Sequence, residues 1–127
     1  MVPPAYLATI RVGGTPRVHP VTPIVGSGRL FLFMEPTSPK GHDLQERRWY
    51  ALHNGVPDTH GSGGEFWMTG EAALVTDRFT RKLALEAATY APADRYILFE
   101  LGLQEVRCNG YGDVALPEPS RWTSASS

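Results

Sequence analysis

Cysteine is almost absent from the 127-residue sequence, and this limits the chemistry that the chain can use. Cys108 is the single cysteine, so no disulfide can form within the chain and no cysteine cluster can bind zinc. His42, His53 and His60 are spaced too irregularly to suggest a metal site. The sequence also lacks a Ser-His-Asp order and a glycine-rich fingerprint of the Rossmann or P-loop kind.

Long hydrophobic runs and a strong net charge are missing as well. No apolar stretch approaches the roughly 18 residues of a membrane-spanning helix, and the N-terminus does not resemble a signal peptide. The formal net charge of -1 argues against general nucleic-acid binding, which requires a basic surface. With 42% hydrophobic and 20% charged residues, the composition predicts a single globular domain over residues 1–127. We therefore expect a cytoplasmic protein whose partner is a small molecule.

What the sequence does contain is a succession of short β-rich runs separated by glycine and proline. These runs predict six strands, at residues 6–12, 17–25, 29–34, 49–53, 65–76 and 96–109; side chains alternate in the second, and the third is apolar on both faces, as in a buried central strand. Pro20 and Pro23 cannot donate hydrogen bonds to a neighbouring strand, so that part of the second strand is expected at an edge, a bulge or a split in the sheet. Residues 54–64 are predicted to form a glycine-rich loop, and residues 117–127 a partly mobile tail.

Two short helices are predicted between these strands. The first begins after Ser38 with proline at the first helical position and continues to about residue 48. The second is capped by Asp77, and its apolar residues recur at four-residue spacing: Phe79, Leu83 and Ala87. Strands and helices in this order favour a small antiparallel barrel.

The start of the first helix has the features of a phosphate site. A helix N-terminus offers free backbone N–H groups and the positive end of the helix dipole. Here the hydroxyls of Thr37 and Ser38 and the ammonium of Lys40 lie at the same place in the sequence. Each also has an ordinary role, because a hydroxyl can simply cap the helix and a lysine can simply be solvated.

Six segments together resemble one known family in their order and spacing. They are residues 7–9, 14–21, 38–44, 50–53, 65–72 and 98–101. These segments resemble the pyridoxamine 5'-phosphate oxidase-like, FMN-binding split-barrel proteins over nearly the whole chain. The resemblance implies a mainly β fold with short helices, namely a six-stranded antiparallel, Greek-key-like split β-barrel that forms a homodimer.

The resemblance also implies which residues bind FMN. Lys40 would bind the phosphate, with Arg17 or His19 also turned toward it. The flavin ring and the start of its ribityl chain would be lined by the second strand: His19, Pro20, Val21 and Thr22. Without the resemblance, His19 is more simply explained as a half-buried histidine that hydrogen-bonds within the sheet.

Two aromatic residues complete the predicted site. Phe33 aligns with an aromatic position near the cofactor in relatives, although an aromatic in a central strand usually belongs to the core. Trp122 resembles a tryptophan that packs across the dimer against the flavin region, although a terminal tryptophan often only covers apolar surface. Glu65, Phe66 and Trp67 would contribute from the partner subunit in the same way.

Three functions remain open at this point. The first is an FMN-dependent oxidoreductase, in which the cofactor supplies the hydride chemistry. The second uses a deazaflavin coenzyme, whose longer acidic tail would need a basic groove of Arg17, Arg47 and Arg48. The third is a non-catalytic module that binds flavin or haem. True pyridoxamine phosphate oxidase activity is not expected, because Pro39 replaces the family's basic residue before the lysine.

Overall fold

The computed structural model describes residues 5–54, 63–111 and 120–123, which form nine strands and two helices. In chain order the elements are β1 (Ala5–Ile10), β2 (Pro16–Val21), β3 (Ile24–Gly26), β4 (Arg29–Met34), α1 (Pro39–Glu46), β5 (Trp49–His53), β6 (Gly63–Leu74), α2 (Arg78–Ala87), β7 (Ile97–Leu101), β8 (Glu105–Tyr111) and β9 (Ser120–Thr123). None of the described helices is long and apolar enough to cross a lipid bilayer.

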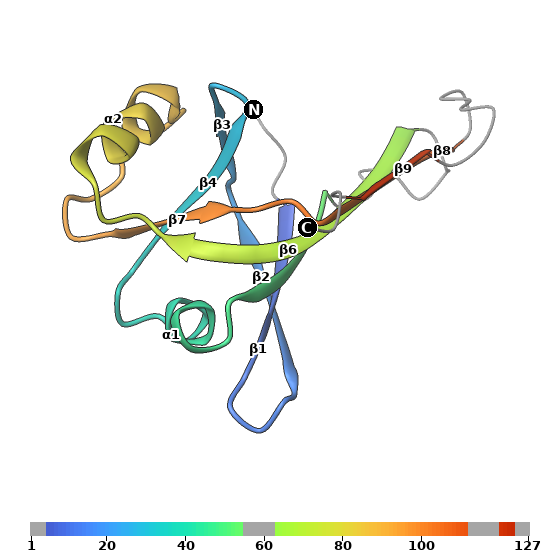
Figure 1. Ribbon diagram of the computed structural model, residues 1–127, viewed down its shortest axis with the longest axis horizontal. Coiled ribbons are helices and arrows are strands. Elements are labelled where there is room, and N and C mark those ends of the chain that lie inside the picture. Colours follow the sequence, from blue (N-terminus) through green and yellow to red (C-terminus); the bar gives the residue numbers. More distant parts are fainter. Residues whose placement is uncertain (1–4, 55–62, 112–119, 124–127) are drawn as a thin grey trace.

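The strands form one curled antiparallel sheet with the order β2-β1-β5-β6-β7-β4-β3, and β8 pairs with β6 and β9 (Figure 1). The twelve-residue strand β6 joins the two halves of this sheet. Its first part pairs with β5 and β8, and its last three residues pair with β7. The sheet ends at β2 on one side and at β3 on the other, although β2 and β3 are neighbours in the sequence. The barrel is therefore split at this point.

Gly70 permits the close approach of two strands in the middle of β6. A Cβ atom at this position would lie 1.8 Å from the carbonyl oxygen of Gly102, well inside van der Waals contact. Gly102 follows β7, and its backbone N–H donates to the carbonyl oxygen of Glu71 at 2.9 Å. The hydroxyl of Tyr50 also donates to the Gly102 oxygen, at 2.8 Å. Glycine is thus required at position 70 of β6, where the chain passes from β7 to β8 against it.

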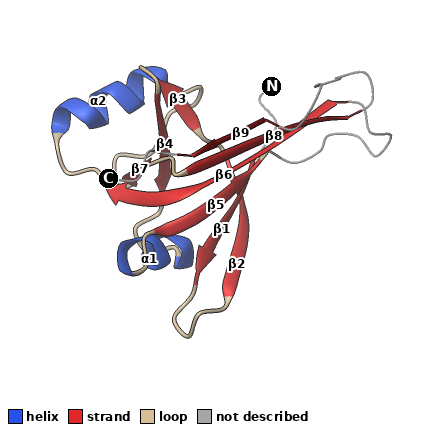
Figure 2. Ribbon diagram, turned by 45° about the vertical axis from the view of Figure 1, so that its right-hand side comes forward, coloured by secondary structure: helices blue, strands red, loops and turns tan. Residues whose placement is uncertain are grey.

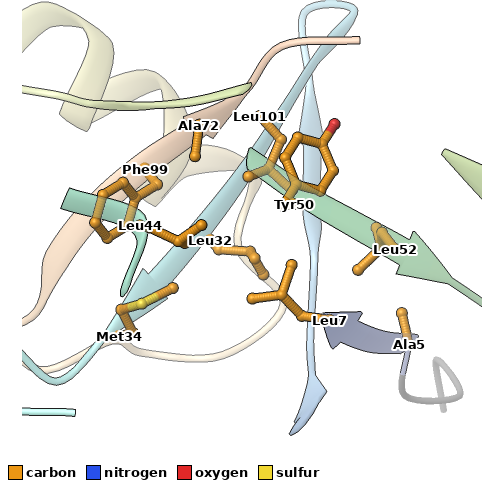
Figure 3. Close-up of a cluster of buried hydrophobic side chains, with 10 residues drawn as sticks. All are labelled: Ala5, Leu7, Leu32, Met34, Leu44, Tyr50, Leu52, Ala72, Phe99 and Leu101. Atoms are coloured by element: carbon orange, nitrogen blue, oxygen red, sulfur yellow. The ribbon is translucent and has the colours of Figure 1, made fainter. Parts of the chain in front are cut away.

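The main core lies inside the curl of the sheet and against α1 (Figure 3). It is formed by Ala5, Leu7, Leu32, Met34, Leu44, Tyr50, Leu52, Ala72, Phe99 and Leu101. A smaller core lies under α2 and consists of Ile24, Phe31, Phe33, Ala84 and Leu98. Figure 2 shows α1 and α2 at separate places on the sheet. Leu44 of α1 belongs to the main core, and Ala84 of α2 belongs to the smaller one. Burial of apolar surface therefore holds both helices in position.

The second helix begins where the sequence predicts, but only part of the predicted apolar stripe faces the core. The Asp77 carboxylate accepts from the backbone N–H of Thr80 at 2.8 Å, as expected of an N-cap. Thr80 and Ala84 are buried, whereas the Phe79 side chain is 74% exposed. The prediction that Phe79 shares the apolar stripe is wrong, whereas Ala87, predicted on the same stripe, packs against the core and lies next to Gly26 of β3. Lys82 and Glu86 are exposed, as predicted.

The mainly β, antiparallel split-barrel class is as predicted, but the number of strands is not. The expected strand at 17–25 is two strands, because Thr22 and Pro23 leave the sheet between β2 and β3. The expected strand at 96–109 is also two, since the chain turns at 102–104 from β7 into β8. Residues 120–123 form β9 rather than a tail. The predicted loop at 55–62 and the remaining tail residues lie outside the described residues.

Candidate functional site

A pocket of about 320 Å³ opens where β2 and β4 end, next to the start of α1. Its lining residues are Pro20, Val21, Thr22, Phe33, Met34, Glu35, Lys40, Tyr90 and Tyr96. Five of these are predicted site residues: Pro20, Val21, Thr22, Phe33 and Lys40. We call this hollow the β2–β4 pocket. The fold thus brings together predicted site residues that lie up to 20 positions apart in the sequence.

The start of α1 holds Lys40 at the mouth of this pocket. Ser38 is the N-cap: its hydroxyl accepts from the backbone N–H of Gly41 at 3.2 Å and donates to the carbonyl oxygen of Glu35 at 2.8 Å. Pro39 follows at the first helical position. Thr37 precedes the cap and is exposed. The Ser38 hydroxyl thus fixes the helix start, and Lys40 supplies a cation in the first turn.

A buried carboxylate organises the basic residues beside Lys40. Asp43 of α1 is 4% exposed and accepts from the hydroxyl of Thr9 at 2.8 Å and from Nε of Arg17 at 3.0 Å. Its second oxygen accepts from Nη2 of Arg47 at 3.4 Å, and Arg47 Nε also donates to the carbonyl oxygen of Ile10 at 2.7 Å. Burial raises the pKa of Asp43, but the hydrogen bonds from Thr9, Arg17 and Arg47 outweigh burial and lower the pKa below its ordinary value. Asp43 is therefore an ionised anchor for two arginines.

His19 lies on β2 two residues after Arg17, and neither of these predicted site residues is among those that line the β2–β4 pocket. Its side chain is half-buried on the inner face of β2, on the same side as Arg17 and Val21. Among the described residues, its Nε2 atom is buried and has no hydrogen-bond partner. Burial lowers the pKa of His19, and the positive charges of Lys40 and Arg17 lower it further against the opposing effect of Asp43. The neutral imidazole is thus favoured while no anion is present.

The other wall of the β2–β4 pocket is aromatic. Tyr90 and Tyr96 belong to the connection between α2 and β7. Arg95 pairs with Glu35 and lies over the ring of Tyr96, 5.3 Å from its centroid. Burial raises the pKa of Tyr90, with a further contribution from Tyr96, so its hydroxyl stays protonated. The pocket therefore has a cationic side at Lys40 and an aromatic side at the two tyrosines.

Phe33 has two roles in the structure. Its side chain is 8% exposed and belongs to the core under α2, and it also lines the pocket. The guanidinium of Arg81 lies 5.2 Å from the centre of its ring. Phe33 therefore belongs to the core and also borders the pocket. Its contact with a cofactor stays a prediction.

Trp122 lies in a different part of the sheet. It is on β9, opposite Val106 of β8, and β8 in turn pairs with β6. The β2–β4 pocket is bordered instead by β2, β4 and α1. The side chain of Trp122 lies outside the described residues. Its predicted contact with a cofactor would therefore have to be made across a dimer.

Sequence reasoning missed several of these residues. Tyr90 and Tyr96 line the pocket, but their sequence context is only a loop with a proline after a helix. Asp43 and Arg47 have the four-residue spacing of a helical ion pair, which was a usable signal. The partner Thr9 could not be found this way, because it reaches Asp43 only through the folding of β1 against α1.

A larger pocket of about 400 Å³ lies between α1 and the β6–β7 pair. Its lining is Leu44, Gln45, Arg48, Ala72, Ala73, Leu74 and Phe99. It contains one cation, Arg48, and none of the predicted site residues. The smaller β2–β4 pocket is the better candidate, because its cationic and aromatic sides face one space. No cluster of potential metal ligands occurs in the described parts of the chain.

Comparison with known proteins supports the architecture. No family model and no curated protein matches the sequence. Among solved structures, a heme-binding protein from Mycobacterium smegmatis has a TM-score of 0.76 and 19% identity, over 96% of this chain and 53% of that one. A NimC/NimA family protein from Clostridium acetobutylicum has a TM-score of 0.75 and 21% identity, over 97% and 85% of the two chains.

A pyridoxamine 5'-phosphate oxidase-related, FMN-binding protein from Nostoc punctiforme has a TM-score of 0.64 and 16% identity, over 98% of this chain and 88% of that one. This chain thus spans about half the length of the mycobacterial protein and most of the other two. The fold is that of the split-barrel proteins. Proteins of this architecture bind different groups, so function has to be argued from the site.

Proposed function

We propose that the protein binds FMN in the β2–β4 pocket and acts as an oxidoreductase on a small molecule. The observation that carries this proposal is the pocket itself, which joins a cationic end at Lys40 to an aromatic wall at Tyr90 and Tyr96. A phosphate needs the first feature, and a flat conjugated ring is suited to the second. The similarity of the fold to an FMN-binding protein supports the same assignment.

The residues present fit the phosphate of FMN. Lys40 offers an ammonium in the first turn of α1, where the helix dipole adds positive potential. Arg17 donates to Asp43 through Nε, so its position on the inner face of β2 is fixed. His19 has a buried nitrogen without a partner among the described residues, which a ligand could satisfy. These three residues would bind the phosphate.

The remaining pocket residues would hold the ring. Pro20, Val21 and Thr22 provide backbone and side-chain surface at the end of β2, and Phe33 lies across from them on β4. Bound FMN would supply reversible hydride and electron transfer. The protein would contribute a fixed orientation, partial exclusion of water and the hydroxyls of Tyr90 and Tyr96 as hydrogen-bond donors.

We further propose that the functional form is a homodimer. The outer face of β1, β2 and β5 exposes large apolar side chains: Tyr6 is 43% exposed, Val18 is 62% exposed and Trp49 is 45% exposed. An apolar hollow of about 180 Å³ lies on the same face. Pro20 belongs to this face and also lines the β2–β4 pocket, so a second copy placed here would border the cofactor.

The deazaflavin alternative is less well supported by the charges. Its acidic tail would need Arg17, Arg47 and Arg48 to continue the basic surface away from Lys40. Arg47 donates to Asp43 and to the carbonyl oxygen of Ile10 instead. Haem binding stays a second candidate, because a heme-binding protein shares the fold.

The absorption spectrum of the purified protein, before and after addition of FMN, riboflavin, deazaflavin coenzyme or haemin, tests the proposal. After removal of excess ligand, we expect the oxidised flavin spectrum to be retained with FMN and to be weaker with riboflavin. Retention of haemin or deazaflavin in preference to FMN would contradict it.

A further inference from the structure

The β2–β4 pocket begins where the pairing of β4 with β7 stops. The last pair of this antiparallel ladder is Met34 with Ile97. One step further along the same register, Glu35 follows β4 and Tyr96 precedes β7, and both residues line the pocket. Strand pairing thus ends at the pocket wall, so side-chain contacts are expected to hold the two segments together there.

Arg95 joins these two segments through an ion pair with Glu35. Its Nε atom donates to Oε1 of Glu35 at 2.9 Å and to Oε2 at 3.0 Å, and its Nη2 atom donates to Oε1 as well. A surface ion pair contributes little to stability, but a guanidinium that contacts both carboxylate oxygens has a fixed orientation. The pair is therefore better suited to positioning a neighbouring group than to stabilising the fold.

The group that this pair can position is the ring of Tyr96. The guanidinium of Arg95 lies 5.3 Å from the centre of the ring, within the range of a cation–π contact. Packing against the core under α2 covers only part of Tyr96, which stays half-buried. Glu35, Arg95 and Tyr96 thus form a continuous series of contacts from the end of β4 to the start of β7.

We propose that the Glu35–Arg95 ion pair positions Tyr96 as the surface against which the flavin ring binds. The inference rests on the proposed FMN function and assigns a positioning role to two charged residues. Because the pair acts through an aromatic contact, its contribution is the same for FMN and for riboflavin, which share the ring and differ in the phosphate. Lys40, in contrast, acts on the phosphate alone.

The Glu35 charge separates positioning from a general effect of charge. Glu35 lines the pocket, so Glu35→Gln makes the pocket more positive, and electrostatics alone would strengthen the binding of anionic FMN. Positioning predicts weaker binding, because a neutral side chain no longer holds the Arg95 guanidinium by two charged oxygens. Similarly, the lost charge of Arg95→Ala would by itself affect FMN and not neutral riboflavin.

The test is a fluorescence titration of wild type and variants with FMN and with riboflavin. We expect Arg95→Ala to lose about three- to tenfold in affinity for both ligands, which is the range of an aromatic contact. Glu35→Gln should lose less, again for both, because one acceptor oxygen remains. In a Tyr96→Leu background, Arg95→Ala should cause no further loss, because the group that it positions is gone.

Arg29 offers a matched control, because it makes the same two kinds of contact away from the pocket. It donates to both carboxylate oxygens of Glu100, at 2.9 and 2.6 Å, and lies 5.5 Å from the centre of the Phe31 ring. None of these three residues lines the β2–β4 pocket. Arg29→Ala should therefore lower the urea midpoint at least as much as Arg95→Ala and leave both flavin affinities at the wild-type value.

A measurement without ligand reports on the ring itself. In protein with ¹³C-labelled tyrosine, the NMR ring signal of Tyr96 should shift in Arg95→Ala and in Glu35→Gln but not in Arg29→Ala. An unshifted signal in the first two variants, unchanged flavin affinities, or a gain of FMN affinity in Glu35→Gln would overturn this inference and leave the FMN proposal intact. Absence of flavin binding to the wild type would overturn both.

Discussion

Arg17 donates through Nε to Oδ2 of Asp43 at 3.0 Å, and this ion pair ties β2 to α1. The two residues lie 26 positions apart, and Asp43 is almost completely buried. Because the first turn of α1 also contains Lys40, the pair fixes the distance between the strand and the helix that border the pocket. The site is therefore organised by an anionic residue that does not itself line it.

We predict that Asp43→Asn destabilises the fold and weakens FMN binding together. Removal of the carboxylate leaves the half-buried guanidinium groups of Arg17 and Arg47 without their charged partner, at a cost of about 3 kcal/mol. Urea unfolding of wild type and variant measures the loss. Glu46→Gln, at an exposed position on the same helix, should leave stability nearly unchanged. Equal stabilities of Asp43→Asn and wild type would contradict the anchoring role.

The contribution of Asp43 should also depend on pH. Its pKa is lower in the folded chain than the unfolded value of about 3.9. The stabilisation is therefore fully present above that unfolded value and is lost as the pH falls through the folded pKa. The difference in unfolding free energy between wild type and Asp43→Asn should stay constant from pH 7 to about pH 5 and shrink in stronger acid. A difference that grows on acidification would be inconsistent with this sign.

We predict that Lys40→Ala weakens FMN binding about ten- to a hundredfold, because it removes a charge-assisted phosphate contact. Folding should be retained, since the helix start depends on Ser38 and Pro39. Quenching of FMN fluorescence measures the affinities. The control is Lys82→Ala, because Lys82 is 77% exposed on α2. Riboflavin should bind wild type and Lys40→Ala equally, and an equal loss for riboflavin and FMN would exclude a phosphate contact.

The proposed dimer face can be tested with a single charge. Val18→Glu places a carboxylate on the exposed apolar face of β1, β2 and β5, and should shift the protein toward monomer at low micromolar concentration. Val25→Glu is the matched control, because Val25 is 70% exposed but lies on β3. Sedimentation velocity distinguishes the two variants. A dimer unaffected by Val18→Glu would place the interface elsewhere.

Gly70→Ala should destabilise the barrel severely, because its Cβ would lie 1.8 Å from the Gly102 oxygen and the backbones would have to separate. Overpacking of this kind costs about 3 kcal/mol or more. Gly102→Ala is the informative comparison, since its Cβ would meet the Glu71 oxygen at 3.1 Å and needs only a small adjustment. Thermal unfolding should rank wild type, Gly102→Ala and Gly70→Ala in descending order of stability. A reversed order of the two variants would contradict this packing.

Much of the local structure could be predicted from the sequence because it depends on local rules. Short β-rich runs between turn residues located β4 and β5 with the observed bounds, and Ser38-Pro39 and Asp77 located both helix starts. The division of 96–109 into β7 and β8 was missed because the turn at Gly102 depends on its contacts with Gly70 and Glu71 of β6, which only the tertiary fold brings near. Phe79 was placed inward because four-residue spacing alone does not say which side of a helix meets the sheet.

The candidate site shows the same limit. Lys40 and the end of β2 were named from helix-start chemistry and from family resemblance, and both border one pocket. Tyr90 and Tyr96 were missed because a loop has no periodicity from which its side chains can be placed. The role of Asp43 was missed because its partner on β2 is brought near only by the tertiary fold.

Sedimentation of the protein with FMN, detected in the visible flavin band, tests the central proposal most directly. The account predicts that FMN sediments with a dimer, at one FMN per chain, and that Lys40→Ala releases it at concentrations where wild type retains it. FMN that does not sediment with the protein would contradict the account, and so would FMN bound stoichiometrically to a monomer.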